Sequence, residues 1–254
     1  MQDTNPAPPR PLEESFRALL GRHAPPGAEG ALSPSVLEDL QIRGTASISA
    51  TVVVGDLRLS SLVLREAVEP SLFARFLVGF TEAVRSLAYA RDGWFDKFTG
   101  DGFIAFWVDP VPMDRDLAQI PRFCQTVLPA ADVLIANLRR NSRNFPTGVG
   151  LALGMDSGPC QLVRVGDALT VVGSPIVGAT RMVGAARARQ ILVNVFLGEE
   201  LERARERLAE DDIRIARATV RTKEYPEGQE VFELVFPQRI RPTAVGAAAA
   251  EATG

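Results

Sequence analysis

The sequence predicts an α+β fold of the ferredoxin-like kind, in which one mixed β-sheet carries its helices mainly on one face. Strand-like and helix-like patterns alternate along the middle of the chain in the order β-α-β-β-α-β, and further strands and helices follow. A Gly-Asp-Gly turn at residues 100–102 joins two apolar runs, which predicts a β-hairpin. Of the 254 residues, 46% are hydrophobic, so the chain can bury a sizeable core.

The individual elements follow from the spacing of apolar residues. The β-branched run at residues 46–55 predicts a buried strand, and apolar residues at helical spacing predict long helices over residues 61–90 and 114–140. Small residues predict a helix over residues 175–186, and charged residues predict a surface helix over residues 197–208. The remaining predicted strands cover residues 94–99, 103–108, 147–153, 169–172, 190–193, 213–219 and 231–236.

Composition divides the chain into three regions. Residues 1–45 are rich in proline and predict a mobile N-terminal arm with some docking turns, in which residues 12–20 and 34–40 can form short helices. Residues 46–236 carry the alternating pattern and form the predicted domain. The Ala-rich tail, residues 237–254, has no packing pattern and is expected to be disordered.

The charge balance and the reactive residues exclude several classes of function. The formal net charge is −3, without the basic surplus of a nucleic-acid-binding protein, so no nucleic-acid partner is expected. The single histidine, His23, cannot supply a His-based zinc site or a Ser-His-Asp or Cys-His centre. Cys124 and Cys160 lie in apolar runs and are expected to be buried, reduced thiols. No apolar run is long enough for a membrane span, and the N-terminus lacks a signal-like apolar segment, so we expect no membrane partner and a cytoplasmic location.

Two aspartates are candidates for binding metal. Asp56 ends the apolar strand in Val-Val-Val-Gly-Asp, and Asp101 lies at the tip of the hairpin. In a β-α-β-β order the first strand lies beside the hairpin, so both carboxylates can converge at one sheet edge. Such a pair suits two divalent cations, Mg²⁺ or Mn²⁺, that share substrate phosphates and can activate an attacking hydroxyl. Each residue alone also fits a structural role, Asp101 in the turn and Asp56 as a helix N-cap.

Two motifs resemble those of the class III adenylate and guanylate cyclases. The run F-D-K-F-T-G-D-G-F-I-A-F-W, at residues 95–107, resembles their K-x-x-G-D-x-x-x-A-x-F segment. The run T-V-V-G-S-P-I-V-G-A-T-R-M, at residues 170–182, resembles their G-x-x-V-N-x-A-x-R-M segment, and the strand ending at Asp56 resembles D-I-x-G-F-T. The resemblance covers residues 46–236 and implies a nucleotide cyclase catalytic domain, which converts a nucleoside triphosphate to a 3′,5′-cyclic monophosphate and pyrophosphate.

The resemblance assigns metal binding to three residues. Asp56 and Asp101 correspond to the carboxylate ligands, and the main-chain carbonyl of Leu57 corresponds to a minor ligand. It also places residues 59–61 near the substrate phosphates. Two divalent cations are therefore the implied cofactors.

The resemblance assigns substrate contacts to four other residues. Lys97 and Thr170 correspond to base-reading positions, and Arg181 corresponds to an arginine that stabilises the phosphates in the transition state. Lys223 falls near a lysine that contacts the terminal phosphates. A guanidinium suits this chemistry because it binds phosphate oxygens in bidentate geometry, although each of the four also fits a surface or strand position. In the family the two aspartates come from one chain and these four residues from the other, so a homodimer with composite active sites is implied.

One substrate-binding position departs from the family pattern. Val177 stands where the pattern has the asparagine that orients the ribose, and a valine cannot donate a hydrogen bond. The segment Asp-Leu-Arg-Leu-Ser-Ser after the first strand also lacks the Gly-Phe of the first motif. Either the site is catalytically silent and only binds nucleotide, or the substrate lies differently because its base is smaller.

The second explanation leads to a more specific resemblance. A cyclase of this size with G-D-G-F-I-A-F-W and an altered asparagine position is similar to the pyrimidine cyclases of bacterial Pycsar anti-phage systems. That likeness implies conversion of UTP to cUMP, or of CTP to cCMP, and a separate effector that carries a cyclic-nucleotide-binding domain. Hydrogen-bond chemistry leaves the base open, since an ammonium and a hydroxyl are compatible with ATP, UTP or CTP. An adenylate cyclase that makes cAMP remains the alternative enzyme.

Overall fold

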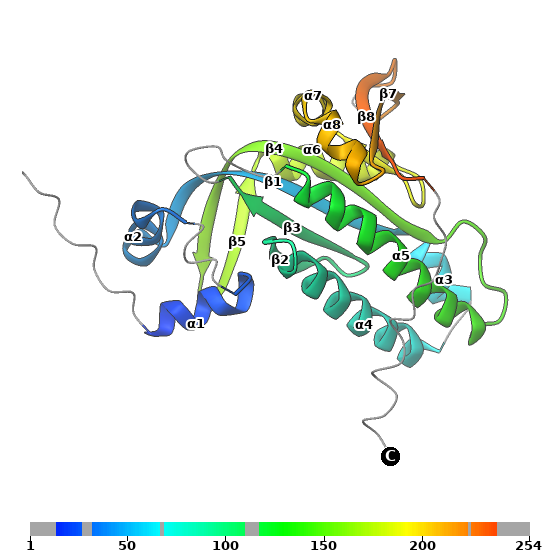
Figure 1. Ribbon diagram of the computed structural model, residues 1–254. Coiled ribbons are helices and arrows are strands. Elements are labelled where there is room, and N and C mark those ends of the chain that lie inside the picture. The colour runs from blue at the N-terminus through cyan, green and yellow to red at the C-terminus, as the bar shows by residue number, and fades with distance from the viewer. Residues whose placement is uncertain (1–13, 27–31, 67–68, 110–116, 223–224, 238–254) are drawn as a thin grey trace, which may run out of the picture.

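The structure is a computed structural model, and it describes residues 14–26, 32–66, 69–109, 117–222 and 225–237 (Figure 1). The helices are α1 (Glu14–His23), α2 (Pro34–Arg43), α3 (Ser60–Glu66), α4 (Pro70–Tyr89), α5 (Gln119–Arg140), α6 (Ser174–Ala185), α7 (Val195–Arg203) and α8 (Arg205–Glu210). The strands are β1 (Thr45–Arg58), β2 (Trp94–Phe98), β3 (Gly102–Val108), β4 (Gly150–Val165), β5 (Ala168–Gly173), β6 (Ile191–Val193), β7 (Arg214–Val220) and β8 (Gln229–Val235). The predicted α+β class with one mixed sheet is confirmed.

The sheet is built around two long antiparallel strands. Its order is β2-β3-β1-β4-β6-β8-β7, and β5 pairs with β4 away from this path. β1 and β4 stay in register from the pair Thr45–Val163 to the pair Arg58–Gly150. The pairing of β4 with β6 is parallel, and the other pairs are antiparallel. The first strand therefore lies directly beside the hairpin of β2 and β3.

The two faces of the sheet bury separate hydrophobic cores. Because side chains alternate along a strand, Val53 and Leu57 of β1 enter the core beneath α4 and α5. Val52 and Val54 enter the core on the opposite face, which α6 and α2 cover. Figure 1 shows the two longest helices, α4 and α5, lying side by side in front of the sheet. These helices cover one face of the strands that carry the candidate site, whose register is set by the pairing of β1 with β3 and β4.

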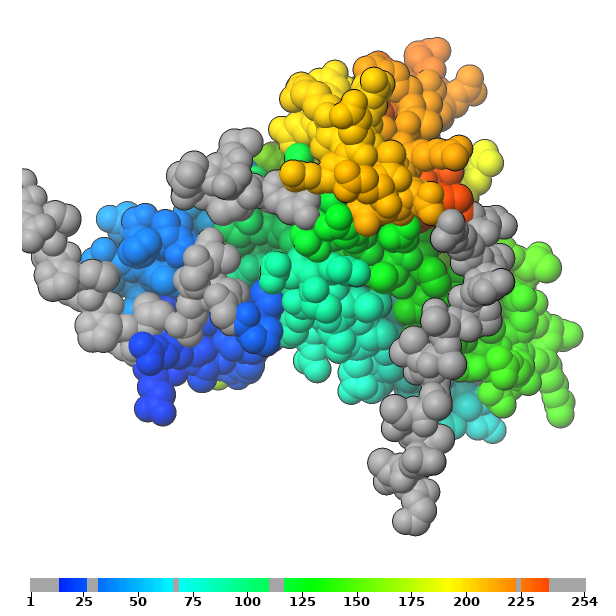
Figure 2. All heavy atoms as spheres, in the orientation of Figure 1, coloured from blue at the N-terminus to red at the C-terminus, as the bar shows by residue number. Residues whose placement is uncertain are grey.

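Helix α1 packs at the end of the sheet where β2 and β5 lie. Its buried residues Phe16, Leu19 and Leu20 belong to the core that also contains Val52 and Val54, which is called the second core below. The Tyr89 hydroxyl at the end of α4 donates a hydrogen bond to the carbonyl of Arg22 at 2.9 Å. Figure 2 shows α1, in dark blue, adjoining the turquoise surface of α4. Residues 14–23 are therefore docked on the fold.

Three predicted elements differ from the observed ones. The surface helix predicted over residues 197–208 is two helices, α7 and α8, which are separated at Ala204. The helix predicted over residues 61–90 is two helices, and α4 begins at Pro70, which has no N–H to donate and suits the first turn. The strand predicted over residues 147–153 continues to Val165 as β4, although Gly158 and Pro159 are unfavourable in strands. Pairing with β1 along its whole length holds these residues extended. Tertiary contacts thus override local preference in β4.

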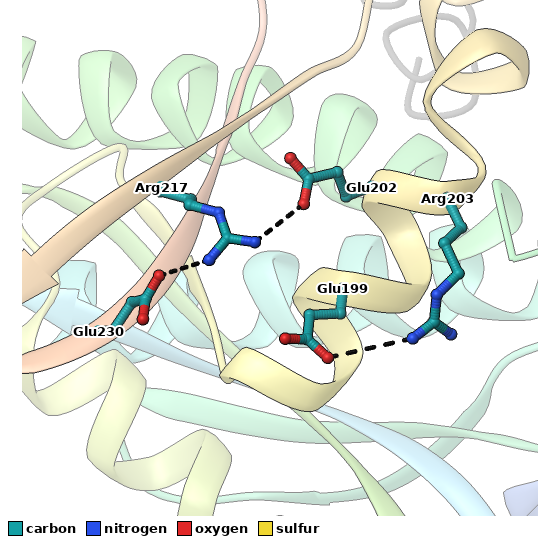
Figure 3. A network of polar contacts seen from close by, with 5 residues as sticks. All are labelled: Glu199, Glu202, Arg203, Arg217 and Glu230. Carbon is teal, nitrogen blue, oxygen red and sulfur yellow. Dashed lines mark hydrogen bonds and ion pairs between the residues drawn. The ribbon is translucent and has the colours of Figure 1, made fainter.

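The β7–β8 hairpin is braced by a surface network (Figure 3). The Arg217 guanidinium lies 2.6 Å from Glu230 on β8 and 3.3 Å from Glu202 on α7. It also stacks over the Phe232 ring, 4.9 Å from the ring centroid. Exposed ion pairs stabilise weakly, so the network mainly fixes how the hairpin lies on α7. Among the described residues, no helix has the length and apolarity needed to traverse a bilayer.

Candidate functional site

The two predicted metal-binding aspartates lie on neighbouring strands. Asp56, near the end of β1, pairs directly with Gly102, the first residue of β3. The carbonyl of Asp101 accepts a hydrogen bond from the Leu57 amide at 3.3 Å. Burial raises the pKa of the Asp56 carboxyl, the Arg58 guanidinium lowers it, and the nearby Asp101 carboxylate raises it again. The charges of the two carboxylates therefore act on each other.

Two neighbouring side chains orient these carboxylates. Arg58 Nη2 lies 3.2 Å from Asp56 Oδ2, and the same nitrogen donates a hydrogen bond to the carbonyl of Val183 in α6. The Ser60 hydroxyl, which is buried at the start of α3, donates to Asp101 Oδ2. The orienting role of Arg58 was not predicted, and Ser60 was expected to face phosphates rather than an aspartate. Arg58 and Ser60 lie two and four residues after Asp56, and that spacing alone does not indicate that a residue orients a metal ligand.

Two glycines allow β1 and β3 to approach closely at this point. A Cβ at Gly55 would overlap the Phe103 ring, and a Cβ at Gly102 would overlap the Gly55 carbonyl. Gly100 has φ of 93°, which a turn of this shape requires and which glycine adopts without strain. The Gly-Asp and Gly-Asp-Gly sequences thus serve to bring the two carboxylates to one sheet edge.

The pair fits a divalent cation that completes its coordination from a substrate. Mg²⁺ is commonly bound by one or two protein carboxylates together with substrate phosphates. Leu57 is 1% exposed as a whole residue and its side chain packs in the core, so its main-chain carbonyl is the one group it could offer to an ion. The part of the chain that the structure describes has no cluster of three or more His, Cys, Asp or Glu side chains. An all-protein metal cage is therefore not seen there, and a shared site suits the two aspartates.

The two predicted base-reading residues are brought into contact. Lys97 Nζ, on β2, donates a hydrogen bond to Thr170 Oγ1, on β5, at 2.8 Å. The same ammonium lies 3.3 Å from Asp96 Oδ2. The Asp96 side chain is 1% exposed, whereas that of Lys97 is 50% exposed. The exposed Lys97 ammonium can therefore face a ligand while it is paired with the buried Asp96 carboxylate.

Asp96 was missed by the sequence analysis. Burial raises the pKa of its carboxyl, and the Thr170 hydroxyl and the Lys97 ammonium lower it. The signal for it was the alternation of Trp94 and Asp96 along β2, which places an acid at an inward-facing position. Buried acids with charged partners are concentrated at functional sites, so Asp96 joins the candidate residues.

Helix α6 presents the next two candidates. Val177 is 52% exposed, and Arg181 follows it four residues later, so both lie on the same exposed side of α6. Gly154 and Gly178 let this helix pack tightly on β4, because a Cβ at Gly154 would overlap the backbone of α6 and a Cβ at Gly178 would overlap Asp156. Lys223 lies outside the described residues. Cys124 and Cys160 are buried, unpaired thiols, as predicted.

Comparison with solved structures finds the same fold in several cyclase domains. No protein-family model matches the chain, and no curated protein matches it. The adenylyl cyclase CyaB from P. aeruginosa superposes with a TM-score of 0.62 at 20% identity, over 77% of this chain and 97% of that one. The guanylyl cyclase Cya2 superposes with a TM-score of 0.60 at 14% identity, over 78% and 98%. The guanylate cyclase domain of RhGC from Catenaria anguillulae, solved in complex with GTP, gives 0.55 at 14% identity, over 76% and 100%.

These similarities concern the fold, because the identities are 20% or lower. Nearly the whole length of each cyclase domain is matched by this chain, so the likeness is to a complete domain. The chain has the fold of the adenylyl and guanylyl cyclase catalytic domains.

Proposed function

We propose that this chain is a nucleotide cyclase, which converts a nucleoside triphosphate to a 3′,5′-cyclic monophosphate and pyrophosphate. The observation that carries the proposal is the meeting of Asp56 and Asp101 at the junction of β1 and β3, within a cyclase fold. A structural role alone does not account for two mutually repelling carboxylates that Arg58 and Ser60 hold in place.

Each candidate residue has a role in this reaction. The ribose 3′-oxygen attacks the α-phosphorus in line with the departing pyrophosphate, so catalysis depends on positioning and on charge stabilisation. Asp56 and Asp101 would hold two divalent cations, Mg²⁺ or Mn²⁺, with the Leu57 carbonyl as a minor ligand. Bound there, these ions lower the pKa of the attacking hydroxyl and neutralise phosphate charge. No histidine base is then required.

Substrate contacts fall to residues on the other elements. Lys97 and Thr170 would read the base, and their direct contact supports a shared role. Arg181, on the exposed side of α6, would hold phosphate oxygens, and Lys223 would contact the terminal phosphates. Two chains would form each site, with the aspartates from one and these four residues from the other, so the active form is a homodimer.

The substrate that we favour is a pyrimidine nucleoside triphosphate, and we favour UTP over CTP. The exposed Val177 supports it, because position 177 lacks the amide that would orient a ribose, so the sugar must be held differently. The product, cUMP or cCMP, would act on a separate effector with a cyclic-nucleotide-binding domain, in a Pycsar-type defence against phage. Its site of action would be the cytoplasm.

A survey of substrates tests this function. The purified chain is incubated with ATP, GTP, CTP or UTP and Mn²⁺, and the products are identified by mass. We expect cUMP, or cCMP, with pyrophosphate. Cyclic AMP alone would make the protein an adenylate cyclase, and nucleotide binding without any cyclic product would make it a silent binding module.

A further inference from the structure

We propose that helix α1 completes the base-binding half of the nucleotide site, by holding the strands that carry Lys97 and Thr170 against each other. The helix does not touch the substrate in this scheme, so its buried residues are positioning residues. The inference rests on the proposed function, since Lys97 and Thr170 are the base-reading residues of that reaction. α1 precedes residues 46–236, which carry the cyclase-like motifs, so the motifs themselves assign it no role.

Among the described residues, the two base-reading strands share no backbone pairing. β2 pairs with β3, and β5 pairs with β4, on the opposite side of β1. β2 and β5 nevertheless lie against each other, and the hydrogen bond from Lys97 Nζ to Thr170 Oγ1 joins them at 2.8 Å. This bond is exposed to water, and a single hydrogen bond contributes only modestly to stability. The approach of the two strands therefore depends on packing.

Helix α1 supplies part of that packing to both strands. Its residues Phe16 and Leu19 are 1% and 3% exposed and lie in the second core. Trp94 of β2 and the β5 residues Leu169 and Val171 are buried in the same core. The helix contacts both strands, and Figure 1 shows it lying beneath β5. One helix therefore bridges the two strands from their buried side.

The C-terminal end of α1 is attached to the same region. The Tyr89 hydroxyl donates to the Arg22 carbonyl at 2.9 Å, and Tyr89 is the last residue of α4, which also contacts β2. Ala24, just after α1, is 5% exposed and lies in the second core. Both the buried side and the C-terminal end of the helix are therefore held near the strand that carries Lys97.

Loss of this packing would act on the base-reading residues through their strands. Leu169 and Val171 are the immediate neighbours of Thr170, and Trp94 lies on the same strand as Lys97. If α1 leaves the core, these three apolar side chains lose part of their cover, and β5 is freed to move away from β2. Lys97 and Thr170 then no longer present their hydrogen-bonding groups at a fixed spacing, so contacts to the base weaken.

Ligands with and without a base test this inference. Leu19→Asp places a charge on the buried side of α1 and should undock it, which is measured as faster amide hydrogen exchange in residues 14–23. The full chain, with Mn²⁺, is titrated calorimetrically with the 3′-deoxy form of the preferred triphosphate, which lacks the attacking hydroxyl, and with inorganic tripolyphosphate. We expect Leu19→Asp to bind the 3′-deoxynucleotide about tenfold more weakly and tripolyphosphate as the wild type does. In turnover, KM should rise while kcat changes little.

The matched control is Ala18→Asp, which introduces the same charge at the neighbouring, exposed position of α1. It should bind both ligands as the wild type does. Leu19→Met keeps the apolar character and nearly the same volume, so it should also retain binding. An equal loss in Ala18→Asp would overturn the inference, because the effect would not come from docking. Equal weakening of both ligands in Leu19→Asp would also overturn it, because the effect would not concern the base.

A second variant keeps the test decisive if Leu19→Asp does not fold. Leu19→Ala removes part of the apolar contact without adding a charge, so it should speed exchange in α1 and weaken 3′-deoxynucleotide binding by a smaller factor. A folded variant with an undocked α1 and wild-type affinity overturns the inference. Unchanged exchange in residues 14–23 of every folded Leu19 variant overturns it too, as does a wild type that binds no nucleotide. A wild type that binds nucleotide but forms no cyclic product instead overturns the proposed function, and leaves the variants to decide this inference.

Discussion

The hydroxyl of Ser60 donates a hydrogen bond to the carboxylate of Asp101, which lies 41 residues later in the chain. Residues that orient metal-binding carboxylates typically change metal affinity by 10- to 100-fold when they are removed. We therefore expect Ser60→Ala to raise the Mn²⁺ concentration for half-maximal activity by about tenfold, with little change in Tm. Activity and thermal unfolding are measured across a Mn²⁺ titration.

The matched control is Ser71→Ala, which changes an exposed serine near the start of α4. It should leave the Mn²⁺ dependence unaltered. Equal Mn²⁺ curves for Ser60→Ala and the wild type would show that Asp101 does not need this hydrogen bond.

The packing of α6 on β4 depends on a glycine. A Cβ at Gly154 would overlap the carbonyl of Ala179 and the amide of Val183, which are backbone atoms that cannot move alone. Gly154→Ala should therefore destabilise the fold by about 1–3 kcal/mol and displace Arg181, lowering activity. Gly79→Ala, on α4 with nothing within 4 Å, should instead stabilise by about 0.5–1 kcal/mol. Denaturant unfolding of both variants checks the contrast, and equal free energies of unfolding would contradict it.

The contribution of α1 to stability can be measured through Phe16. Its side chain is 1% exposed in the second core, and removing a buried Phe side chain costs about 3–5 kcal/mol. We expect Phe16→Ala to lower the free energy of unfolding by that amount. The exposed neighbour Arg17→Ala is the control and should change it little. A loss below about 1 kcal/mol for Phe16→Ala would mean that α1 is not packed on the domain in solution.

Stability should depend on pH through Asp156. Burial raises the pKa of its carboxyl above 3.8, while the Asn194 side chain and the Ser157 amide lower it. The folded state therefore binds the proton more tightly than the unfolded state does, and this stabilisation is fully present below pH 3.8 and lost as pH rises through the folded pKa. Asp156→Asn keeps an oxygen for the Ser157 amide and removes the charge, so its Tm should match the wild type in acid and exceed it at neutral pH.

The exposed Asp167→Asn variant serves as the control for this series and should follow the wild type at each pH. If the difference in Tm between the wild type and Asp156→Asn is the same at every pH, burial does not disfavour the charged form of Asp156.

Shared active sites predict that two inactive variants restore each other. Asp56→Asn and Arg181→Ala each remove one half of the proposed composite site. When the two chains are mixed and allowed to exchange, a heterodimer has one intact site, so about a quarter of the wild-type activity should return. Each variant alone stays inactive in the same assay. No recovery in a mixture that forms heterodimers would place all the catalytic residues in one chain.

The sequence was sufficient for the layout around Asp56 and Asp101 because strand periodicity and turn chemistry are local signals. A β-branched run and a Gly-Asp-Gly turn specify a strand and a hairpin, and their order then makes the strands neighbours. The contact of Lys97 with Thr170 depended on the resemblance to known cyclases, since 73 residues separate them.

Other features could not be read from local pattern. The length of β4 is imposed by its pairing with β1, whereas Gly158 and Pro159 argue against a strand there. The break before α4 was signalled by Pro70 but was hidden within a continuous helical pattern of apolar residues. The buried position of Asp96 on β2 depends on the packing of β5 and α1 against that strand, which no local motif encodes.

Cyclic-nucleotide formation by single-carboxylate variants tests the central claim most directly. Wild type, Asp56→Asn and Asp101→Asn are incubated with the preferred triphosphate and Mn²⁺, and cyclic product and pyrophosphate are quantified together. We expect equal amounts of both products from the wild type, and a loss of at least about a hundredfold in each variant while the fold is retained. A folded Asp56→Asn or Asp101→Asn that still cyclises at the wild-type rate would contradict a shared metal site at these two residues.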